Sequence, residues 1–174
     1  MKSFWNMAKD RRGFTLMELL IVMVILSILV AIATGTYATS SKRGRDNRRK
    51  NDLRSVATAL EAYFSDKGRY PTGVNGVMMG CGAGDTGACG WGDSGGFTDQ
   101  YGTLYMVLVP SDPIDSQTYY YVSTTGANYK LYAKLENAYD AGDGVDQNGY
   151  ANTDCSTDSN IECNYGIASA NTTP

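Results

Sequence analysis

The hydrophobic pattern opens with one uninterrupted apolar run that extends from Phe14 to Ala33. Thirteen of these twenty residues are Leu, Ile, Val or Phe, and Glu18 is the one charged residue among them. As a helix with a rise of about 1.5 Å per residue, the run is about 30 Å long, which matches the hydrocarbon thickness of a bilayer. Its apolar side chains favour insertion by about 4 to 8 kcal/mol, whereas a carboxylate near one end costs up to about 3 kcal/mol. The run is therefore predicted to enter a membrane.

The helical pattern continues after this run, but it becomes amphipathic. Apolar residues recur at the spacing of one helix face, which predicts a helix that covers a core: Leu53, Val56, Ala57, Leu60 and Phe64. Residues 42–52 are polar all round, with opposite charges four positions apart, which predicts a solvated helical neck: Lys42/Asp46, Asp46/Lys50 and Arg48/Asp52. Gly68 and the pair Tyr70-Pro71 are stop signals, so one helix is predicted from Phe14 to about Ser65.

Strand patterns come later in the chain. Residues 73–102 hold eleven glycines in thirty positions, so they are predicted to form a flexible loop with no packed element. Residues 118–123 are β-branched and aromatic, residues 129–135 alternate between apolar and polar, and a turn containing Gly126 joins the two strands. Residues 163–168 form a weaker third strand. The predicted fold class is α+β, a long N-terminal helix packed on a small antiparallel sheet in a single domain.

Composition and charge narrow the function. Residues 42–54 carry a net charge of +5, whereas residues 66–174 carry −9, so a basic helix leads into an acidic head. The chain has no histidine, which excludes Ser-His-Asp and Cys-His catalysis and imidazole zinc sites. The carboxylates show no pairing that would indicate a hydrolase. The chain is therefore not expected to be an enzyme, and a secreted or anchored hydrolase is a minor alternative.

The four cysteines form two pairs, Cys81 with Cys89 and Cys155 with Cys163, whose members are eight positions apart. None has the Cys-x-x-Cys spacing of thiolate metal sites, so disulfides in an oxidising compartment are favoured. Two local bridges would each contribute about 2 to 3 kcal/mol. Four cysteines permit three connectivities, and the sequence does not choose among them.

Three interpretations of the apolar run compete. A secretory signal would be cleaved after Ala31-Ile32-Ala33 and release a chain that begins at Thr34. A plain transmembrane anchor is the second. The third rests on RRGFTLMELLIVMVILSILVAIA, which resembles the signature of type IV prepilins and type II secretion pseudopilins. A glutamate is costly within the apolar region of a secretory signal, so the third interpretation is favoured.

The resemblance implies a course of processing and assembly. A prepilin peptidase on the cytoplasmic side would cut after Gly13 and methylate the new amine of Phe14. Glu18 would attract the Phe14 amine of a neighbouring subunit as an assembly platform in the inner membrane adds subunits to a fibre. DLRSVATALEAYFSDKGRYP is similar to the start of a pseudopilin head. The expected parts are a leader (1–13), a transmembrane and assembly helix (14–35), an amphipathic helix (36–66) and a head (67–174).

The expected location follows from the same resemblance. The chain would wait in the inner membrane, surrounded by lipid, with its head outside the cytoplasm, and would then enter a periplasmic or extracellular fibre. The charge of +5 after the span, against +3 before it, opposes this orientation by the positive-inside rule. The cysteine pairs outweigh that argument, because they suit an oxidising exterior.

The basic run from Lys42 to Arg54 is a candidate nucleic-acid site, as in a DNA-uptake pseudopilin. Its seven basic side chains form an electrostatic footprint. No aromatic residue interrupts the run to stack on bases, however, so anionic lipid headgroups or the acidic heads of other copies are the favoured partners.

Calcium is the one cofactor that the sequence suggests. Short oxygen-bearing side chains gather in the glycine-rich segment DAGDGVDQN and could converge on the ion: Asp140, Asp143, Asp146 and Asn148. Their spacing is not that of an EF-hand, and a solvated acidic loop is the more common arrangement for such a segment. Alternative ligands near the second cysteine pair are Asp154, Asp158 and Glu162.

Overall fold

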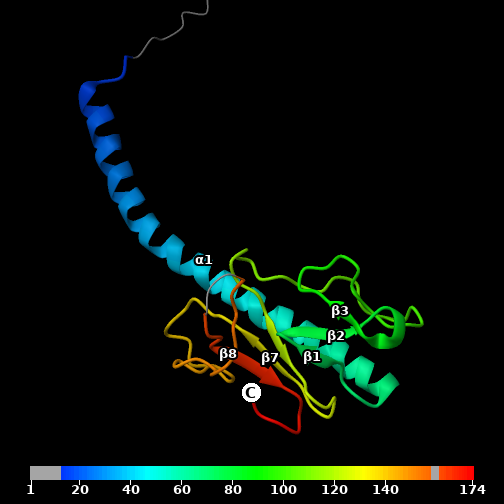
Figure 1. The fold of residues 1–174 in the computed structure, drawn as a ribbon. Helices are drawn as coiled ribbons and strands as arrows, with labels where there is room; N and C mark the ends of the chain where they lie inside the picture. Colours follow the sequence, from blue (N-terminus) through cyan, green and yellow to red (C-terminus); the bar gives the residue numbers. More distant parts are fainter. Residues whose placement is uncertain (1–12, 158–160) are drawn as a thin grey trace, which may run out of the picture. The chain divides into compact units, whose positions relative to one another are not determined.

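The computed structural model describes residues 13–157 and 161–174, which form two compact units, Met1–Ser40 and Ser41–Pro174. Helix α1, Leu16–Lys67, contributes to both units (Figure 1). The long helix is confirmed, although it begins and ends two residues later than predicted. Its last turn is followed by Gly68, which has a φ of 69° and donates its N–H to the carbonyl of Phe64 (2.8 Å), a common way to end a helix.

The amphipathic face of α1 packs into the head largely as predicted. Leu53, Val56 and Leu60 are fully buried. The prediction is wrong for Phe64, which is 37% exposed, and Tyr63 is buried in its place. The reason is a specific partner, because the Tyr63 ring stacks on Phe97 at a centroid distance of 5.2 Å. The buried face is therefore turned slightly from the stripe expected from the sequence.

The C-terminal strands form the predicted antiparallel sheet, with shorter bounds. Its order is β6 (Tyr120–Val122), β7 (Lys130–Ala133) and β8 (Tyr165–Ala168). Tyr121 pairs with Leu131, and Leu131 with Ile167. Alternate side chains of this region, Tyr129, Leu131, Ala133 and Leu135, are buried in the main core, as the alternation predicted. Tyr132 on the opposite face packs against the Cys155 and Cys163 pair.

The glycine-rich segment is where the sequence-based prediction is wrong. Instead of a structureless loop, it holds most of two small antiparallel sheets and one short 3₁₀ helix, η1 (Ala83–Asp85). The first sheet has three strands, β1 (Thr72–Val74), β2 (Val77–Cys81) and β3 (Gly87–Cys89). The second pairs β4 (Phe97–Thr98) with β5 (Leu104–Met106).

Local chemistry explains why this glycine-rich segment is ordered. Asn75 and Gly76 join β1 to β2, and both have positive φ (49° and 80°), as a tight hairpin turn requires. The disulfide Cys81–Cys89 then links β2 to β3. The Gly73 N–H donates to the carbonyl of Ser123 (2.7 Å), which connects this sheet to the C-terminal one. Turn geometry, a covalent link and a neighbouring strand thus order the segment, together with the burial of Met78, Cys89 and Phe97 in the core.

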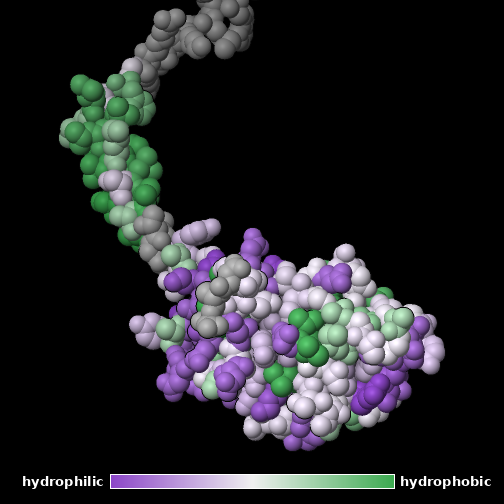
Figure 2. Space-filling view, in the orientation of Figure 1, coloured by the Kyte–Doolittle hydropathy of each residue, from purple (hydrophilic) through white to green (hydrophobic). Residues whose placement is uncertain are grey.

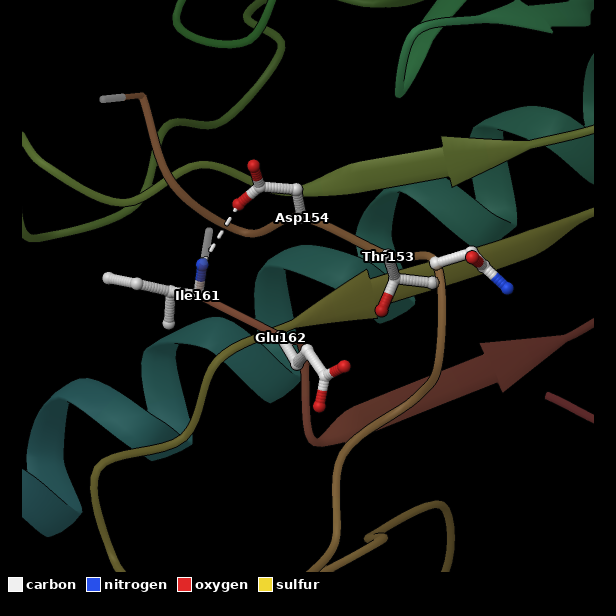
Figure 3. Close-up of a pocket in the computed structure, with 5 residues that line it drawn as sticks. Thr153, Asp154, Ile161 and Glu162 are labelled. Atoms are coloured by element: carbon white, nitrogen blue, oxygen red, sulfur yellow. Dashed lines mark hydrogen bonds between the residues drawn. The ribbon is translucent and has the colours of Figure 1, made fainter. Parts of the chain in front are cut away.

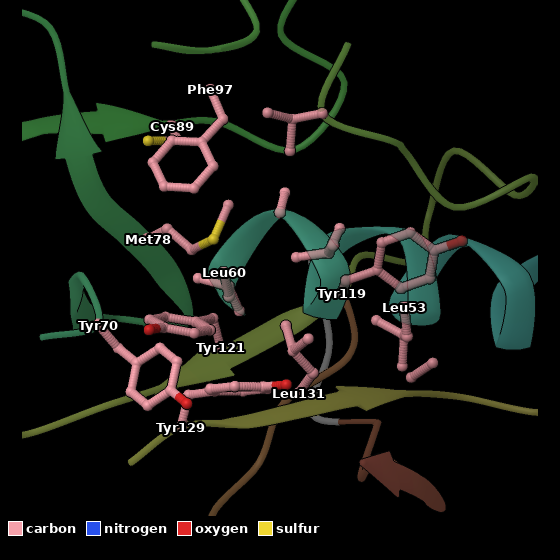
Figure 4. Packing of buried hydrophobic residues seen from close by; sticks show 14 of the residues in the cluster. Leu53, Leu60, Tyr70, Met78, Cys89, Phe97, Tyr119, Tyr121, Tyr129 and Leu131 are labelled. Atoms are coloured by element: carbon pink, nitrogen blue, oxygen red, sulfur yellow. The ribbon is translucent and has the colours of Figure 1, made fainter. Parts of the chain in front are cut away.

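The core of the head is rich in tyrosine and packs between the helix and the strands (Figure 4). Tyr70 meets Tyr129 edge-to-face at 4.8 Å between ring centroids. The buried hydroxyl groups have acceptors: Tyr121 donates to the carbonyl of Pro71 and Tyr119 to Asp52 Oδ2, both at 2.7 Å. Among the described residues, every buried side-chain nitrogen and oxygen has a hydrogen-bond partner. The polar atoms of the aromatic core are therefore all hydrogen-bonded.

Candidate assembly segment and buried charge cluster

The apolar part of α1 has no cover of its own. All side chains from Phe14 to Ile32 are exposed, including large ones such as Leu16 (88%) and Met23 (65%). Hydrophobic residues predominate along this part of the helix in Figure 2, whereas the visible face of the head is a mixture of hydrophilic and intermediate residues with smaller hydrophobic patches. In the part of the chain that the structure describes, α1 is the one helix long and apolar enough to cross a membrane. Such a surface needs another apolar environment, either lipid or protein.

Thr15 and Glu18 close the N-terminus of α1 with a reciprocal cap. Glu18 Oε2 accepts from the Thr15 N–H (2.9 Å) and the Thr15 hydroxyl (2.8 Å), while the Glu18 N–H donates to Thr15 Oγ1 (3.2 Å). This is a capping box, whose Thr-x-x-Glu pattern was visible in the sequence but not used in the prediction. Glu18 is thereby fixed in the first turn, three residues from the non-helical Thr15. Its predicted partner, a free Phe14 amine, is a peptide N–H in the uncleaved chain.

The predicted processing point lies directly before this cap. Gly13, Phe14 and Thr15 are exposed and precede the first helical residue, Leu16. The Gly13–Phe14 bond is therefore not protected by helical hydrogen bonds. Residues 1–12, the rest of the predicted leader, lie outside the described part of the chain. Cleavage after Gly13 and methylation of Phe14 stay predictions.

Arg49 forms the centre of a buried charge cluster in the head. Its guanidinium makes a bidentate pair with Asp112, from Nε to Oδ2 (2.6 Å) and from Nη2 to Oδ1 (2.8 Å). Nη1 donates to Asp46 Oδ1 and Glu136 Oε1, both at 2.9 Å, and Nη2 donates to Gln117 Oε1 at 3.0 Å. The side chain of Arg49 is completely buried. Five bonds match the five N–H donors of the guanidinium, so this buried charge is fully satisfied.

The acidic partners of Arg49 also form hydrogen bonds with backbone N–H groups and with a second arginine. Asp46 accepts from the N–H groups of Glu136 and Asn137, both at 2.9 Å, and Arg45 adds a bidentate pair to Glu136, with both bonds at 2.6 Å. Hydrogen bonds from Arg45, opposed by burial and assisted by Arg49, lower the pKa of Glu136 to about 2. Burial alone would lower the pKa of Arg49, but its bonds to Asp112 and Glu136 raise it. Glu136 and Arg49 are therefore both charged at neutral pH.

This cluster corrects the prediction of a solvated neck. Asp46 and Arg49, expected to face water, are among the buried residues of the head. Asp46 pairs with Arg49 rather than with Lys42 or Lys50, whereas the predicted pair of Arg48 with Asp52 is present at 3.7 Å. The exposed basic side chains of the run are Lys42, Arg43, Arg48 and Arg54. The basic footprint considered for nucleic acid is thus smaller than the sequence suggested.

A second ion cluster lies where α1 ends. Lys67 Nζ is 2.8 Å from Asp99 Oδ2 and 3.1 Å from Asp85 Oδ2, and it lies over the ring of Tyr101. Asp99 also accepts from the N–H groups of Tyr101 (2.9 Å) and Thr103 (2.8 Å). The Lys67 bond, opposed by burial and assisted by the backbone donors, lowers the pKa of Asp99 to about 2. The end of the helix is thereby tied to the turn between β4 and β5.

Both local disulfides, left open by the sequence, are present in the head. Cys81 is bonded to Cys89 and Cys155 to Cys163, with Cα atoms 5.4 and 5.2 Å apart. Each bridge closes a short chain reversal, and Cys89, Cys155 and Cys163 are completely buried. The bridges therefore contribute to the stability of the loops rather than to a metal or redox site.

The predicted calcium ligands do not come together as one group. Asp140 forms an ion pair with Lys50 (2.6 Å), and Asp146 Oδ1 accepts from the Asn148 N–H (2.9 Å). Asp143 is exposed on the loop. Over residues 13–157 and 161–174, no three acidic or sulfur-bearing side chains are placed to hold a metal ion. Calcium binding stays a prediction without geometric support from these residues.

The alternative acidic pair lines a shallow pocket beside the second disulfide (Figure 3). Its lining includes Thr153, Asp154, Ile161 and Glu162. Asp154 Oδ1 accepts hydrogen bonds from the N–H of Ile161 (3.1 Å) and from the N–H and the hydroxyl of Ser156. These bonds, with the Ser156 side chain first, lower the pKa of Asp154 against the effect of burial. Asp158, the third candidate, lies outside the described residues.

Comparison with known proteins agrees with the geometry of the first unit. Residues 8–34 match the family model described as the prokaryotic N-terminal methylation motif. The chain is 41% identical over 64 residues to the type IV major pilin protein PilA of Myxococcus xanthus, covering 37% of this chain and 29% of the relative. The chain carries the N-terminal segment of the pilin and pseudopilin family.

Two further relatives align over different lengths. The type II secretion system core protein G of Pseudomonas aeruginosa is 26% identical over 127 residues, which cover 72% of this chain and 83% of the relative. The fimbrial protein EcpC of Eikenella corrodens is 39% identical over 61 residues, or 35% and 40% of the two chains. The chain thus spans half or less of the length of several curated relatives. No solved structure matches the chain significantly. Pilins and pseudopilins are structural subunits and not enzymes.

Proposed function

We propose that this chain is a structural subunit of a type IV pilus or a type II secretion pseudopilus, cleaved after Gly13, N-methylated at Phe14 and polymerised through its apolar helix. One observation carries the proposal. A run of apolar side chains lies uncovered on α1, with a single carboxylate, Glu18, fixed in its first turn. The alignment to pilin PilA and to secretion protein G supports the same class of function.

The uncovered helix surface explains why the chain needs two successive environments. At about 25 cal/mol per Å² of apolar area, exposure of so many Leu, Ile and Val side chains to water is strongly unfavourable. Lipid covers the segment before assembly, and the same segments of other copies cover it in a fibre. Assembly therefore exchanges one apolar environment for another, and the difference in free energy between them is small. A modest specific interaction then decides whether the helix lies in lipid or in the fibre.

Glu18 supplies that specific interaction. Within its own chain its carboxylate accepts only from Thr15 in the bonds that the structure describes, and no cation lies beside it there. A carboxylate in an apolar environment is costly unless it is paired with a charge. Cleavage after Gly13 creates an amine on Phe14, and the amine of a neighbouring copy completes the pair and sets the axial register of the fibre.

The head and its surroundings fit this role. Its two disulfides suit an oxidising space outside the cytoplasm. The partners of the chain are then a peptidase on the cytoplasmic side, lipid, an assembly platform in the inner membrane, and further copies or related subunits. A heterologous contact between such copies does not close and extends into a filament.

The test replaces Glu18 in full-length protein expressed as the only copy of this subunit. Glu18→Gln keeps the side-chain size, and Glu18→Leu removes an acidic insertion cost of about 2 to 3 kcal/mol. Both variants are expected to enter the membrane and to be cleaved after Gly13, but to yield no sheared surface fibres. Mass spectrometry of the mature N-terminus checks the processing, with N-methyl-Phe14 expected in the wild type.

Two results would contradict the proposal. A wild-type protein that begins at Thr34 would be a secreted soluble protein. Normal fibre yield from Glu18→Leu would show that the charge has no role in assembly. Asp66→Asn, a change at an exposed carboxylate of the same helix, is the matched control and is expected to assemble normally.

A further inference from the structure

We propose that the head contacts the next copy of this chain through two complementary surfaces on opposite flanks of α1. The first, called the apolar flank, consists of Leu104, Val107 and Leu108, of which Leu108 lines a groove together with Arg48. The second, called the tyrosine loop, is residues 138–143, which present Tyr139 and Asp143. This inference rests on the proposed function and adds to it the residues through which successive heads meet.

The apolar flank is exposed although its side chains are large. Val107 is 74% exposed, Leu108 56% and Leu104 55%. These residues belong to β5 and the segment after it, which forms a groove with α1 lined by Arg48, Asp52, Ser55, Gly92, Met106, Leu108, Val109, Pro110 and Ser111. Neighbouring exposed apolar side chains next to a groove form the kind of surface that another protein covers.

Arg48 gives this apolar flank a positive charge that its own chain uses weakly. Its Nε lies 3.7 Å from Asp52 Oδ2, which is long for a charge-assisted bond. The same oxygen accepts the hydroxyl of Tyr119 at 2.7 Å. The Arg48 side chain is 59% exposed, so its guanidinium has donors available to an acidic partner.

The tyrosine loop has the opposite character. Tyr139 is 93% exposed, and among the described residues its ring makes no aromatic or cation contact. Asp143 is also exposed, and in the described ranges its carboxylate has no hydrogen bond or ion pair. The loop is nevertheless well held, because Asp140 pairs with Lys50 (2.6 Å) and the Asn137 N–H donates to Asp46 (2.9 Å). The loop that carries the exposed Tyr139 ring is therefore already ordered, so less conformational entropy is lost when the ring binds a partner.

The helix geometry separates the two surfaces. Residues of α1 are rotated by about 100° each, so Arg48 and Lys50 point about 200° apart. Arg48 faces the apolar flank, Lys50 holds the tyrosine loop, and the buried Arg49 and Leu53 lie between them. A single partner copy cannot meet both surfaces of one head at once. The pairing is therefore heterologous, with each head meeting one neighbour on each side.

Complementary chemistry identifies the partner as a second copy. The Tyr139 ring matches the apolar side chains of Val107 and Leu108, and the free carboxylate of Asp143 matches Arg48. The contact is small, since one tyrosine buries about 150 to 250 Å², far below the roughly 1,600 Å² of a stable interface. It acts only where the apolar helices already hold the copies together at high effective concentration.

The experiment cross-links the two surfaces in the full-length protein, expressed as the only copy of this subunit. Val107→Cys and Tyr139→Cys are combined in one chain, and membranes and sheared fibres are oxidised mildly. A ladder of disulfide-linked multimers is expected. The control combines Tyr139→Cys with Thr124→Cys, an exposed position in the turn between β6 and β7, and is expected to give no ladder.

A charge exchange then tests the polar part of the contact. Arg48→Asp and Asp143→Arg, each alone, are expected to lower the yield of the ladder by about five- to tenfold, because a like-charge contact replaces an attractive one. The two changes together are expected to restore it. Restoration excludes misfolding as the cause of the single effects.

Each outcome decides the inference separately from the proposed function. Wild-type fibres without a ladder, or an equal ladder from the control pair, overturn the contact but not the subunit role. A single dimer band overturns the heterologous arrangement. Absence of wild-type fibres overturns the proposed function, while a specific ladder in the membranes would still support the contact.

Discussion

Glu18 and Arg49 lie on the same helix, and both are charges in surroundings that disfavour charge. Arg49 is completely buried, yet its five donors meet acceptors from Asp46, Asp112, Glu136 and Gln117. Glu18 lies in an exposed apolar segment, and its carboxylate bonds only to Thr15 in the contacts that the structure describes. One charge is neutralised by its own chain, and the other is not. The head thus satisfies this buried charge by itself, whereas the first unit offers Glu18 no cation among the described residues.

The largest expected effect comes from removing the satisfied charge. Arg49→Met keeps much of the side-chain volume but leaves Asp112 and Asp46 buried without their cation. Breaking a buried pair in this way typically costs about 3 to 5 kcal/mol. We expect a loss of this size in the free energy of unfolding, measured by denaturant titration of the full chain in detergent.

The matched control for Arg49 is its neighbour in the sequence. Arg48 is exposed and weakly paired, so Arg48→Met is expected to change the free energy of unfolding by less than about 0.5 kcal/mol. A loss from Arg49→Met as small as the one expected for Arg48→Met would mean that the buried cluster adds nothing to the stability of the head. Membrane insertion is expected to be normal for both, because neither residue lies in the apolar run.

The pH dependence of stability is the next largest effect. The folded-state pKa values of Glu136 and Asp99 are lowered to about 2, below their usual values of 4.5 and 3.8. Their contribution is therefore present above about pH 5 and is lost as the pH falls towards 2. For the Arg49 cluster, we expect a loss of about 1 to 2 kcal/mol after allowance for solvent screening.

Thermal unfolding at a series of pH values checks this dependence. The chain has no histidine, so stability is expected to be nearly flat between pH 6 and 8. Glu136→Gln should lower stability at pH 7 and weaken the decline below pH 5. A wild-type profile that stays flat down to pH 2 would contradict the assigned pKa shifts.

The smallest effect concerns the cap that holds Glu18. Thr15→Val keeps the shape of the side chain but removes the hydroxyl, so the first turn of α1 should lose about 1 kcal/mol. Hydrogen exchange of the amides in residues 16–19 in micelles is expected to become faster. Thr15→Ser retains the hydroxyl and should exchange like the wild type. If both variants exchange equally, the capping box does not order this turn.

The elements that the sequence predicted well are those whose local pattern matches their final environment. Alternation through Tyr129, Leu131 and Ala133 predicted β7, because one face of that strand is buried in the core. The turn at Asn75-Gly76 was equally readable, since this dipeptide favours a tight hairpin. The prediction of a loop rests on the glycine content alone and does not use this dipeptide, although the hairpin and a disulfide order the segment.

The buried charge cluster could not be predicted in the same way. The neighbourhood of Arg49 is polar in every direction along the sequence, which favours a solvated helix. Its acceptors Asp112 and Glu136 lie 63 and 87 residues away. A short window contains no information about such partners, so the tertiary fold decides which charge of the run is buried.

The acidic loop shows the opposite relation between sequence and structure. Asp140, Asp143 and Asp146 are close in the sequence, which suggested a common ion as one possibility. In the folded head, Asp140 forms an ion pair with Lys50, and Asp146 accepts a hydrogen bond from the backbone N–H of Asn148. Closeness along a flexible segment therefore says little about convergence, because each carboxylate finds its own nearest donor.

The paired bonds of Arg49 also determine how the head responds to a mechanical load. A pull on α1 along its axis is opposed in part by Arg49 and Arg45, whose guanidinium groups bind Asp112 and Glu136 with two bonds each. These bonds share the load in parallel, so they must break together rather than one after another. The helix and the head therefore resist sliding past each other, which is the kind of strength that a subunit needs when its fibre is stretched.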